Sequence, residues 1–254
     1  LISRENGKNT ASRGGKVFRG MSQHSSFSEF DEGRTRHRGR RDRPIHRKRM
    51  TDPKGFEQEG EKPGEYLALG GFKTSYGKYA TSSIRMKDAL PIMAWRNAQI
   101  SALRQKEPLT REQQLQYFEE VVGKQFSEKR PRQVLLRFTL QGELIGYGGL
   151  VHVDWENSRA EASFLLETER ARDVSLYQKE CRIFMAFLQQ CAFTALGLNK
   201  ITTEAYAHRE FHLQALDSSG FTREGILRQQ VQVDGTWVDA IVSSCLKSEF
   251  EGQG

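Results

Sequence analysis

The stretches Ala160–Leu166 (AEASFLL) and Ile201–Tyr206 (ITTEAY), with a long helical segment between them, decide the fold of this chain. Each is a short run of apolar residues with polar residues interleaved, which predicts a strand. Between them, Asp173–Leu196 repeats apolar residues every three or four positions, which predicts one amphipathic helix. At about 1.5 Å of rise per residue this helix would be roughly 36 Å long, the width of a whole domain.

Hairpins flank this central segment. Upstream, Gln133–Thr139 alternates in polarity and is joined by a Gln-Gly turn to Leu144–Val153. Downstream, Asp234-Gly235 is the strongest turn signal in the chain, and it joins Gly225–Val233 to Trp237–Leu246. Mixed strands with helices between them predict a single α/β domain.

Two local signals add detail to this outline. Gly146, Gly148 and Gly149 interrupt the strand Leu144–Val153, which predicts a bulge or a close approach of two backbones. Thr110–Gln113 (TREQ) has the pattern of a capping box, which predicts that a helix begins there.

The positive charge of the chain is concentrated near its N-terminus. The 254 residues carry a net charge of +7, whereas residues 1–50 alone contain 14 Lys and Arg against 5 Asp and Glu. A run of this composition cannot offset its ordering entropy by burying apolar surface, so residues 1–50 are predicted to be a basic disordered tail. Residues 51–78, rich in Gly, Glu and Lys, are predicted to be a linker, and residues 79–250 the folded domain.

Two interpretations of the arginine-rich run at residues 34–49 stay open: weak contact with nucleic acid through counterion release, or a solvated tail. No apolar run approaches the roughly 20 residues of a membrane span, and the N-terminal residues lack the apolar core of a secretory signal. The three cysteines have no metal-ligand spacing, so we expect buried thiols, no metal and a cytoplasmic location. They are Cys181, Cys191 and Cys245.

Five stretches of the chain follow one another in an order that is typical of a single superfamily. They are Trp95-Arg96-Asn97, Thr110–Glu119, the strand pair Gly146–Val153 and Ala160–Leu166, Phe193–Tyr206 and, most specifically, Gly220–Asp239 (GFTREGILRQQVQVDGTWVD). Together they resemble the GCN5-related N-acetyltransferase (GNAT) superfamily. They come closest to its branch of ribosomal-protein N-terminal acetyltransferases and amino-sugar-nucleotide acetyltransferases.

The resemblance implies the GNAT fold, which is α/β with a mixed, mostly antiparallel central sheet and helices on both faces. The family's fourth and fifth strands, here Ala160–Leu166 and Ile201–Tyr206, splay apart and hold acetyl-coenzyme A (acetyl-CoA) between them. The implied reaction is direct transfer of the acetyl group to a primary amine, without a covalent enzyme intermediate and without a metal.

The resemblance also implies which residues contact the cofactor. The strand-to-helix turn would hold the pyrophosphate at a helix N-terminus, although Glu169–Ser175 lacks the glycines that are usual there. Arginines in this turn could compensate through charge-assisted contacts, or they could be merely solvated. The expected contacts are the backbone of Phe164, Leu165 and Leu166, the turn residues Arg170, Arg172, Asp173, Val174 and Ser175, and Arg209, which replaces the usual Asn.

Three residues are candidates for proton transfer. An acceptor amine must lose a proton to attack, and Glu161, at the start of the fourth family strand, is the candidate general base. Tyr206 lies on the facing strand and is a second candidate. Leu216 stands where many members have the Tyr that protonates the departing thiolate, so His212 is the candidate acid.

A further set of residues is expected at the acceptor. By resemblance, Trp95, Arg96 and Asn97 lie at its entrance, and the exposed aromatic Trp155 and the strand-end His208 are further candidates. Each of these residues could instead be part of the core or of its edge, with no contact to the acceptor.

The acceptor class stays open between an amino-sugar nucleotide, a peptide N-terminus and a small amine. Two other functions also remain open. One is a GNAT-fold binding module without catalysis, suggested by the glycine-poor turn and by Leu216. The other is a ribosome- or RNA-associated acetyltransferase that uses its basic tail. A homodimer is one candidate assembly.

Overall fold

The structure is a computed structural model that describes residues 64–252. The basic tail predicted at residues 1–50 and the first part of the predicted linker lie outside the described residues. The folded part begins before the expected boundary at residue 79, because Tyr66 and Leu69 are buried in the core. The Tyr66 hydroxyl accepts a hydrogen bond of 3.1 Å from the Leu135 amide, which fixes this segment on the sheet.

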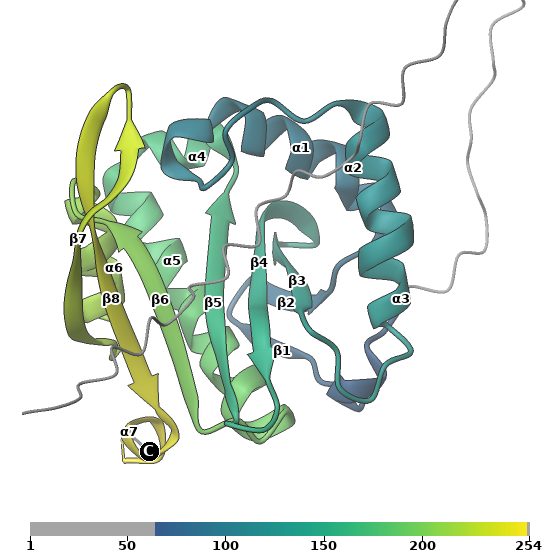
Figure 1. The fold of residues 1–254 in the computed structure, drawn as a ribbon. Helices are drawn as coiled ribbons and strands as arrows, with labels where there is room; N and C mark the ends of the chain where they lie inside the picture. Colours follow the sequence, from purple (N-terminus) through teal and green to yellow (C-terminus); the bar gives the residue numbers. More distant parts are fainter. Residues whose placement is uncertain (1–63, 253–254) are drawn as a thin grey trace, which may run out of the picture. The chain divides into compact units, whose positions relative to one another are not determined.

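The core of the described chain is one eight-stranded sheet with the order β1-β2-β3-β4-β5-β6-β8-β7 (Figure 1). Every neighbouring pair is antiparallel except β5 and β6, which confirms the expected mixed, mostly antiparallel sheet. The strands are β1 (Thr74–Tyr76), β2 (Tyr79–Ser83), β3 (Val134–Leu140), β4 (Glu143–Asp154), β5 (Arg159–Leu166), β6 (Lys200–Tyr206), β7 (Thr222–Val233) and β8 (Thr236–Leu246).

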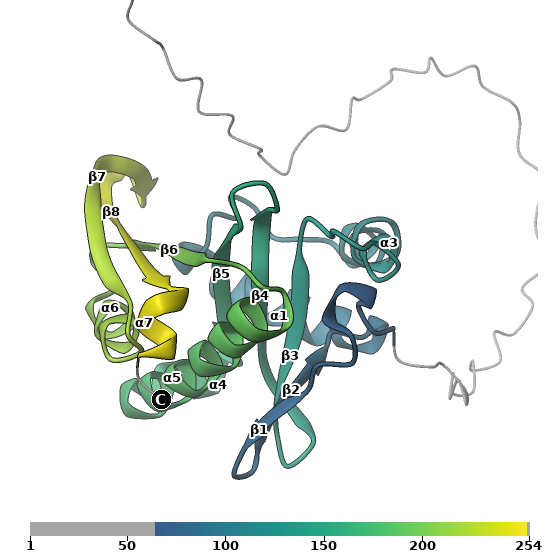
Figure 2. The same cartoon turned by 90° about the horizontal axis from the view of Figure 1, so that it is seen from below.

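Helices cover both faces of the sheet, as Figure 2 shows from below. Side chains alternate along the strands, so each face of the sheet has its own apolar cluster. On one face Leu135 and Leu165 pack against α1 and the π-turn that follows α2. On the other face Leu136 and Leu166 pack against α5. The helices are α1 (Ala89–Ala98), α2 (Arg111–Tyr117) with a π-turn at Phe118–Val122, α3 (Gly123–Gln125), α4 (Thr168–Arg172), α5 (Val174–Gln190) with a π-turn at Cys191–Ala195, α6 (Glu210–Asp217) and α7 (Lys247–Glu251); short 3₁₀ turns occur at Leu67–Leu69, Met86–Asp88 and Ile100–Ala102.

Local sequence signals account for several element boundaries. The capping box predicted at Thr110 is present, since its hydroxyl accepts from the Gln113 amide at 3.2 Å. The helix expected at Asp173–Leu196 is α5 and its terminal π-turn, and Asp173 caps it by accepting from the Leu176 amide at 3.0 Å. The turn at Asp234 and Gly235 has positive φ at both residues, as a type I′ hairpin requires.

The glycines of β4 allow two backbones to approach closely, as the sequence predicted. A Cβ at Gly148 would lie 2.1 Å from the Ser163 carbonyl oxygen, and one at Gly149 would lie 2.1 Å from that of Val134. No real Cβ tolerates such a distance, so β4 can hold both of its neighbours in register only with glycine at these positions.

We expect Gly148→Ala to lower the free energy of unfolding by about 1–3 kcal/mol, because the methyl group must push β5 away from β4. Urea unfolding measures this loss. The matched control is Gly225→Ala on the exposed strand β7, where an added Cβ meets nothing within 4 Å. Equal unfolding free energies for the two variants would contradict the close approach.

Candidate active site

A gap opens between β5 and β6. The two strands pair in parallel only at Arg159–Lys200, Ala160–Ile201 and Glu161–Thr202, and beyond these residues they diverge (Figure 1). The splay expected between Ala160–Leu166 and Ile201–Tyr206 is therefore present; in the structure these are the fifth and sixth strands, because the short β1 precedes them.

Backbone direction decides which β5 amides face this gap. The Glu167 amide donates to the Ile145 carbonyl at 2.9 Å, so odd-numbered residues of β5 bond to β4 and even-numbered residues point the other way. The Leu166 carbonyl accordingly accepts from the Gln99 side chain at 2.9 Å across the gap. Of the three amides expected at the thioester, Phe164 and Leu166 face the gap, whereas Leu165 faces β4.

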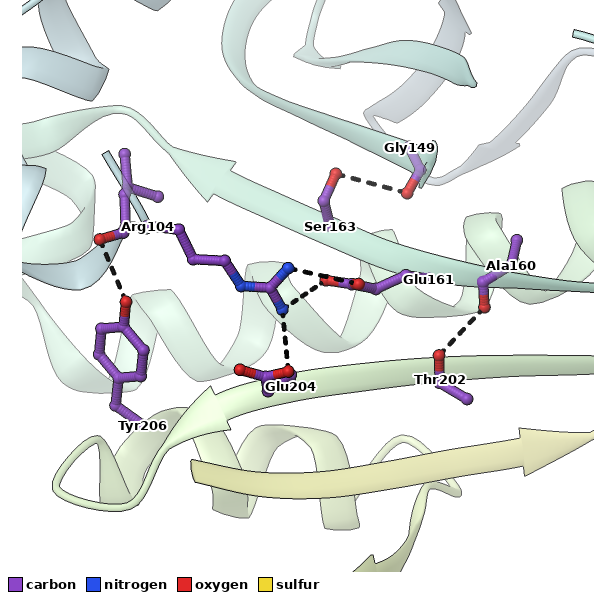
Figure 3. Close-up of polar contacts among 9 residues, drawn as sticks. Arg104, Gly149, Ala160, Glu161, Ser163, Thr202, Glu204 and Tyr206 are labelled. Atoms are coloured by element: carbon purple, nitrogen blue, oxygen red, sulfur yellow. Dashed lines mark hydrogen bonds and ion pairs between the residues drawn. The ribbon is translucent and has the colours of Figure 1, made fainter. Parts of the chain in front are cut away.

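The candidate base Glu161 lies where the strands separate and is paired with a cation (Figure 3). Arg104 Nη2 lies 2.9 Å from Glu161 Oε1 and 3.4 Å from Glu204 Oε2 on β6. The side chains of Glu161 and Glu204 are 24% and 22% exposed, and that of Arg104 is 48% exposed. Burial lowers the pKa of Arg104, but the two carboxylates outweigh this and raise it, so the guanidinium stays charged.

Tyr206 lies further along β6, on the same face as Glu204. Its hydroxyl donates to the Leu103 carbonyl at 3.2 Å (Figure 3), and burial raises its pKa, so the phenol is neutral at pH 7. The exposed His208 follows at the end of the strand, with its ring centroid 5.9 Å from that of Tyr206. Glu161 on β5 and Glu204 and Tyr206 on β6 therefore lie on one face of the sheet, on opposite sides of the gap, with His208 just beyond the end of β6.

The connection between α1 and α2 lies across this gap. We call Gln99–Arg104 the strap. The Gln99 side chain donates to the Leu166 carbonyl at the end of β5. The Ala102 carbonyl accepts from Arg209 at 3.5 Å, and the Leu103 carbonyl accepts from the Tyr206 hydroxyl. The strap therefore touches both diverging strands, or residues beside them, through polar contacts.

The Trp95–Asn97 element holds this connection in place. Arg96 donates to the Gln105 side chain at 3.0 Å and to the Tyr147 hydroxyl at 2.9 Å. Asn97 exchanges two hydrogen bonds with the Leu109 backbone, and Trp95 packs against the apolar cluster beneath α1. All three were expected at the acceptor entrance; the structure shows contacts that shape the strap.

Trp155 lies away from the gap. It belongs to the turn between β4 and β5, at the end where β5 and β6 are still paired, and its indole donates to the Pro131 carbonyl at 2.9 Å. From the sequence we expected Trp155 to contact the acceptor, because its turn looked exposed. In the structure the indole packs against the main apolar cluster.

In the turn before α5, the two arginines expected at the pyrophosphate are both paired with glutamates. Arg170 makes a bidentate pair with Glu180, which is fully buried on α5. The Arg170 guanidinium therefore faces α5. Arg172 pairs with Glu169 at the surface, at 2.7 Å. With Asp173 as N-cap, the exposed Val174 and Ser175 begin α5, and their amides have no acceptor within the helix.

The candidate acid His212 is part of a buried network. Arg209 donates to the Tyr177 hydroxyl at 3.2 Å, and that hydroxyl lies 2.9 Å from His212 Nδ1. Burial, together with Arg209, lowers the pKa of His212 to about 3, so its imidazole is neutral at pH 7 and is unsuited to act as an acid. Leu216 is fully buried, and its hydrocarbon side chain has no proton to donate.

Two residues of the site were not singled out from the sequence. Arg104 stands in a connection without a motif, and only the fold brings it to Glu161. Glu204 could have been found, because its alternation with Tyr206 along β6 places both side chains on one face of the sheet.

Residues 64–252 contain no cluster of three or more His, Cys, Asp or Glu side chains suited to holding a metal ion. Within the same range, no helix combines the length and apolar character that crossing a membrane requires. The three cysteines are buried free thiols, as expected.

Comparison with known proteins gives a consistent result. Residues 81–242 match the family described as the acetyltransferase (GNAT) domain. The chain is 30% identical over 110 residues to an uncharacterized N-acetyltransferase p20 of Bacillus licheniformis; the match covers 43% of this chain and 59% of that protein.

Solved structures share the fold. Spermidine N-acetyltransferase from Vibrio cholerae in complex with CoA and spermine is 16% identical, with a TM-score of 0.61, covering 68% of this chain and 98% of that one. Mutant forms of the spermidine/spermine N-acetyltransferase from the same organism are 17% identical, with a TM-score of 0.59 and coverage of 69% and 98%.

Proposed function

The chain belongs to the GNAT acetyltransferase family, and from this premise we propose that it transfers an acetyl group from acetyl-CoA to a primary amine in the gap between β5 and β6. The observation that carries the proposal is the carboxylate of Glu161 at the point where the two strands diverge. A gap lined by free backbone groups on one strand and by a carboxylate suits a thioester and an amine that must lose a proton.

The chain offers donors for acetyl-CoA at two places. The gap-facing amides of Phe164 and Leu166 have no partner strand on that edge within the described residues, so they are available to the thioester and the pantetheine arm. The open amides of Val174 and Ser175 lie at the positive end of the α5 dipole, which favours a pyrophosphate. Of the arginines in the turn, Arg172 is the exposed one.

The reaction needs one proton acceptor and no covalent enzyme intermediate. The neutral amine nitrogen bonds to the thioester carbonyl carbon, the carbon–sulfur bond breaks, and the amine proton passes to Glu161. The departing thiolate has a pKa near 8.5, so water can protonate it and the absence of Tyr at position 216 is tolerated. His212 has no part in this scheme, because it is neutral.

A small amine is the acceptor class that the site favours. The structural neighbours named above act on spermidine, and the two carboxylates beside the gap here favour a cationic molecule. A binding module without catalysis is the second candidate, supported by the buried Leu216 and by the arginine that pairs with Glu161.

Release of free CoA tests the proposed function. We expect the full chain, incubated with acetyl-CoA and a panel of small alkylamines, to release thiol at a rate that depends on the amine, measured with a colorimetric thiol reagent. Amine-independent release at the background rate, together with a thermal shift on adding acetyl-CoA, would establish the binding module instead. The absence of any thermal shift at saturating acetyl-CoA would exclude both candidates.

Val174→Pro tests the pyrophosphate position. Proline is favoured at the first helical residue, and Asp173 before it has φ −84° and ψ 105°, an extended conformation that a following proline accepts. The helix therefore persists while one donor disappears. Losing one hydrogen bond to a charged group should raise the Kd of acetyl-CoA about tenfold, as measured by calorimetry. Ser175→Ala, which keeps its amide, is the control; equal Kd values for the two variants would move the pyrophosphate elsewhere.

A further inference from the structure

A single nitrogen atom of Arg104 joins the two strands at the point where they separate. Nη2 lies 2.9 Å from Glu161 on β5 and 3.4 Å from Glu204 on β6 (Figure 3). Nη1 adds only a longer contact of 3.5 Å to Glu161. One nitrogen held between two carboxylates is also the arrangement that a primary ammonium group would adopt, because –NH₃⁺ has three donors on one atom.

We propose that Nη2 of Arg104 occupies the position of the acceptor's ammonium group, so that Arg104 is an internal cation that the acceptor must displace. The inference rests on the proposed function and adds a substrate class to it. The class is strongly basic alkylamines, which enter as cations, in preference to amines that are mostly neutral near pH 7.

Electrostatics gives the reason for this preference. Without a cation, Glu161 and Glu204 would face one another as like charges in a half-buried site, which is unfavourable. A molecule that replaces Arg104 must therefore bring its own positive charge. A lysine-like amine, with a pKa near 10.4, is charged at pH 7, whereas an aromatic amine arrives neutral and leaves the two carboxylates unbalanced.

Arg104 is also held weakly enough to leave. Its side chain is 48% exposed, so water competes for the guanidinium and weakens its ion pairs. The strap that carries it includes Ile100–Ala102, a 3₁₀ turn with no buried residue. The polar contacts of the strap across the gap are single hydrogen bonds to Leu166, Thr168, Arg209 and Tyr206. Of its residues, Leu103 packs against the apolar cluster under α1, so movement of the strap around Ile100–Ala102 disturbs few buried contacts.

Displacement also prepares Glu161 for its proposed role. Arg104 Nη2 lies 2.9 Å from Glu161 Oε1, in the position that the amine must take to pass its proton to this carboxylate. When the acceptor replaces Arg104, its nitrogen lies beside Glu161. The ammonium first loses one proton to water, and the neutral amine then passes a second proton to Glu161 as it attacks the thioester. Displacement therefore brings the amine and the base into contact in a single event.

The test measures binding of 1,4-diaminobutane to the full chain by calorimetry at pH 7, without acetyl-CoA, so that it does not depend on turnover. We expect Arg104→Gln to bind the diamine about tenfold more tightly than the unmodified chain, and Glu204→Gln about tenfold more weakly. The control Arg111→Gln, at the exposed start of α2, should leave the Kd unchanged. Thermal unfolding of each variant verifies that it is folded.

Weaker or unchanged diamine binding by Arg104→Gln would overturn the inference, since it would make Arg104 part of the acceptor site or remote from it. Equal binding of aniline and 1,4-diaminobutane to the unmodified chain would overturn the cationic class. If the diamine binds as expected but no amine releases CoA, the proposed function fails while the ammonium site stands.

Discussion

Replacing Glu161 with Gln should lower turnover about 10²–10⁴-fold, the usual contribution of a general base, while the affinity for acetyl-CoA stays unchanged. Glutamine keeps the shape of the side chain and can still contact Arg104, but it cannot take a proton. The measurement is the steady-state rate of CoA release with a saturating alkylamine, alongside the Kd of acetyl-CoA.

The pH dependence separates a base from a structural residue. If Glu161 is the base, the loss shrinks as the pH rises, because more of the amine is then already neutral. A purely structural Glu161 would instead give a modest, pH-independent loss and a lower Tm. Glu156→Gln, at an exposed turn position, is the matched control. Full turnover of Glu161→Gln at neutral pH would move the role to Tyr206, His208 or a chain of water molecules.

Removing Arg170 should cost about 3–5 kcal/mol of unfolding free energy, because Glu180 would be left as an unpaired charge inside the protein. Glu180 is 0% exposed, and its carboxylate is held by Arg170 and by the Tyr79 hydroxyl at 3.1 Å. Arg170→Met keeps the length of the side chain but removes the charge. Urea unfolding at pH 7 measures the effect.

Two comparisons make this second prediction specific. Arg172→Met removes a pair with Glu169 in which both side chains are more than 70% exposed, so its effect should stay below about 1 kcal/mol. The double variant Arg170→Met/Glu180→Gln should lose less than Arg170→Met alone, since a neutral amide is less costly to bury than an unpaired carboxylate. Similar losses for both arginine variants would show that the Arg170–Glu180 pair does not stabilise the fold.

The local order of the chain was readable from its sequence. Polarity alternation placed Ala160–Leu166 and Ile201–Tyr206 in strands, and the Asp234-Gly235 turn fixed the last hairpin, because these signals act between residues close in the chain. The splay between those two strands came from the family resemblance. The N-terminal boundary was placed too late, because the polar composition of residues 51–78 hid Tyr66, which is buried against the sheet.

The partners of the charged side chains were decided by the tertiary structure alone. Arg170 looked available to a phosphate, yet it faces Glu180 because the helical turn of α4 directs it toward α5. Arg104 reaches Glu161 across 57 residues and Glu204 on the next strand, and no local pattern encodes such a meeting. The sequence determines each strand and the face on which a carboxylate lies, because both depend on local periodicity; which cation meets that carboxylate depends on how distant segments pack.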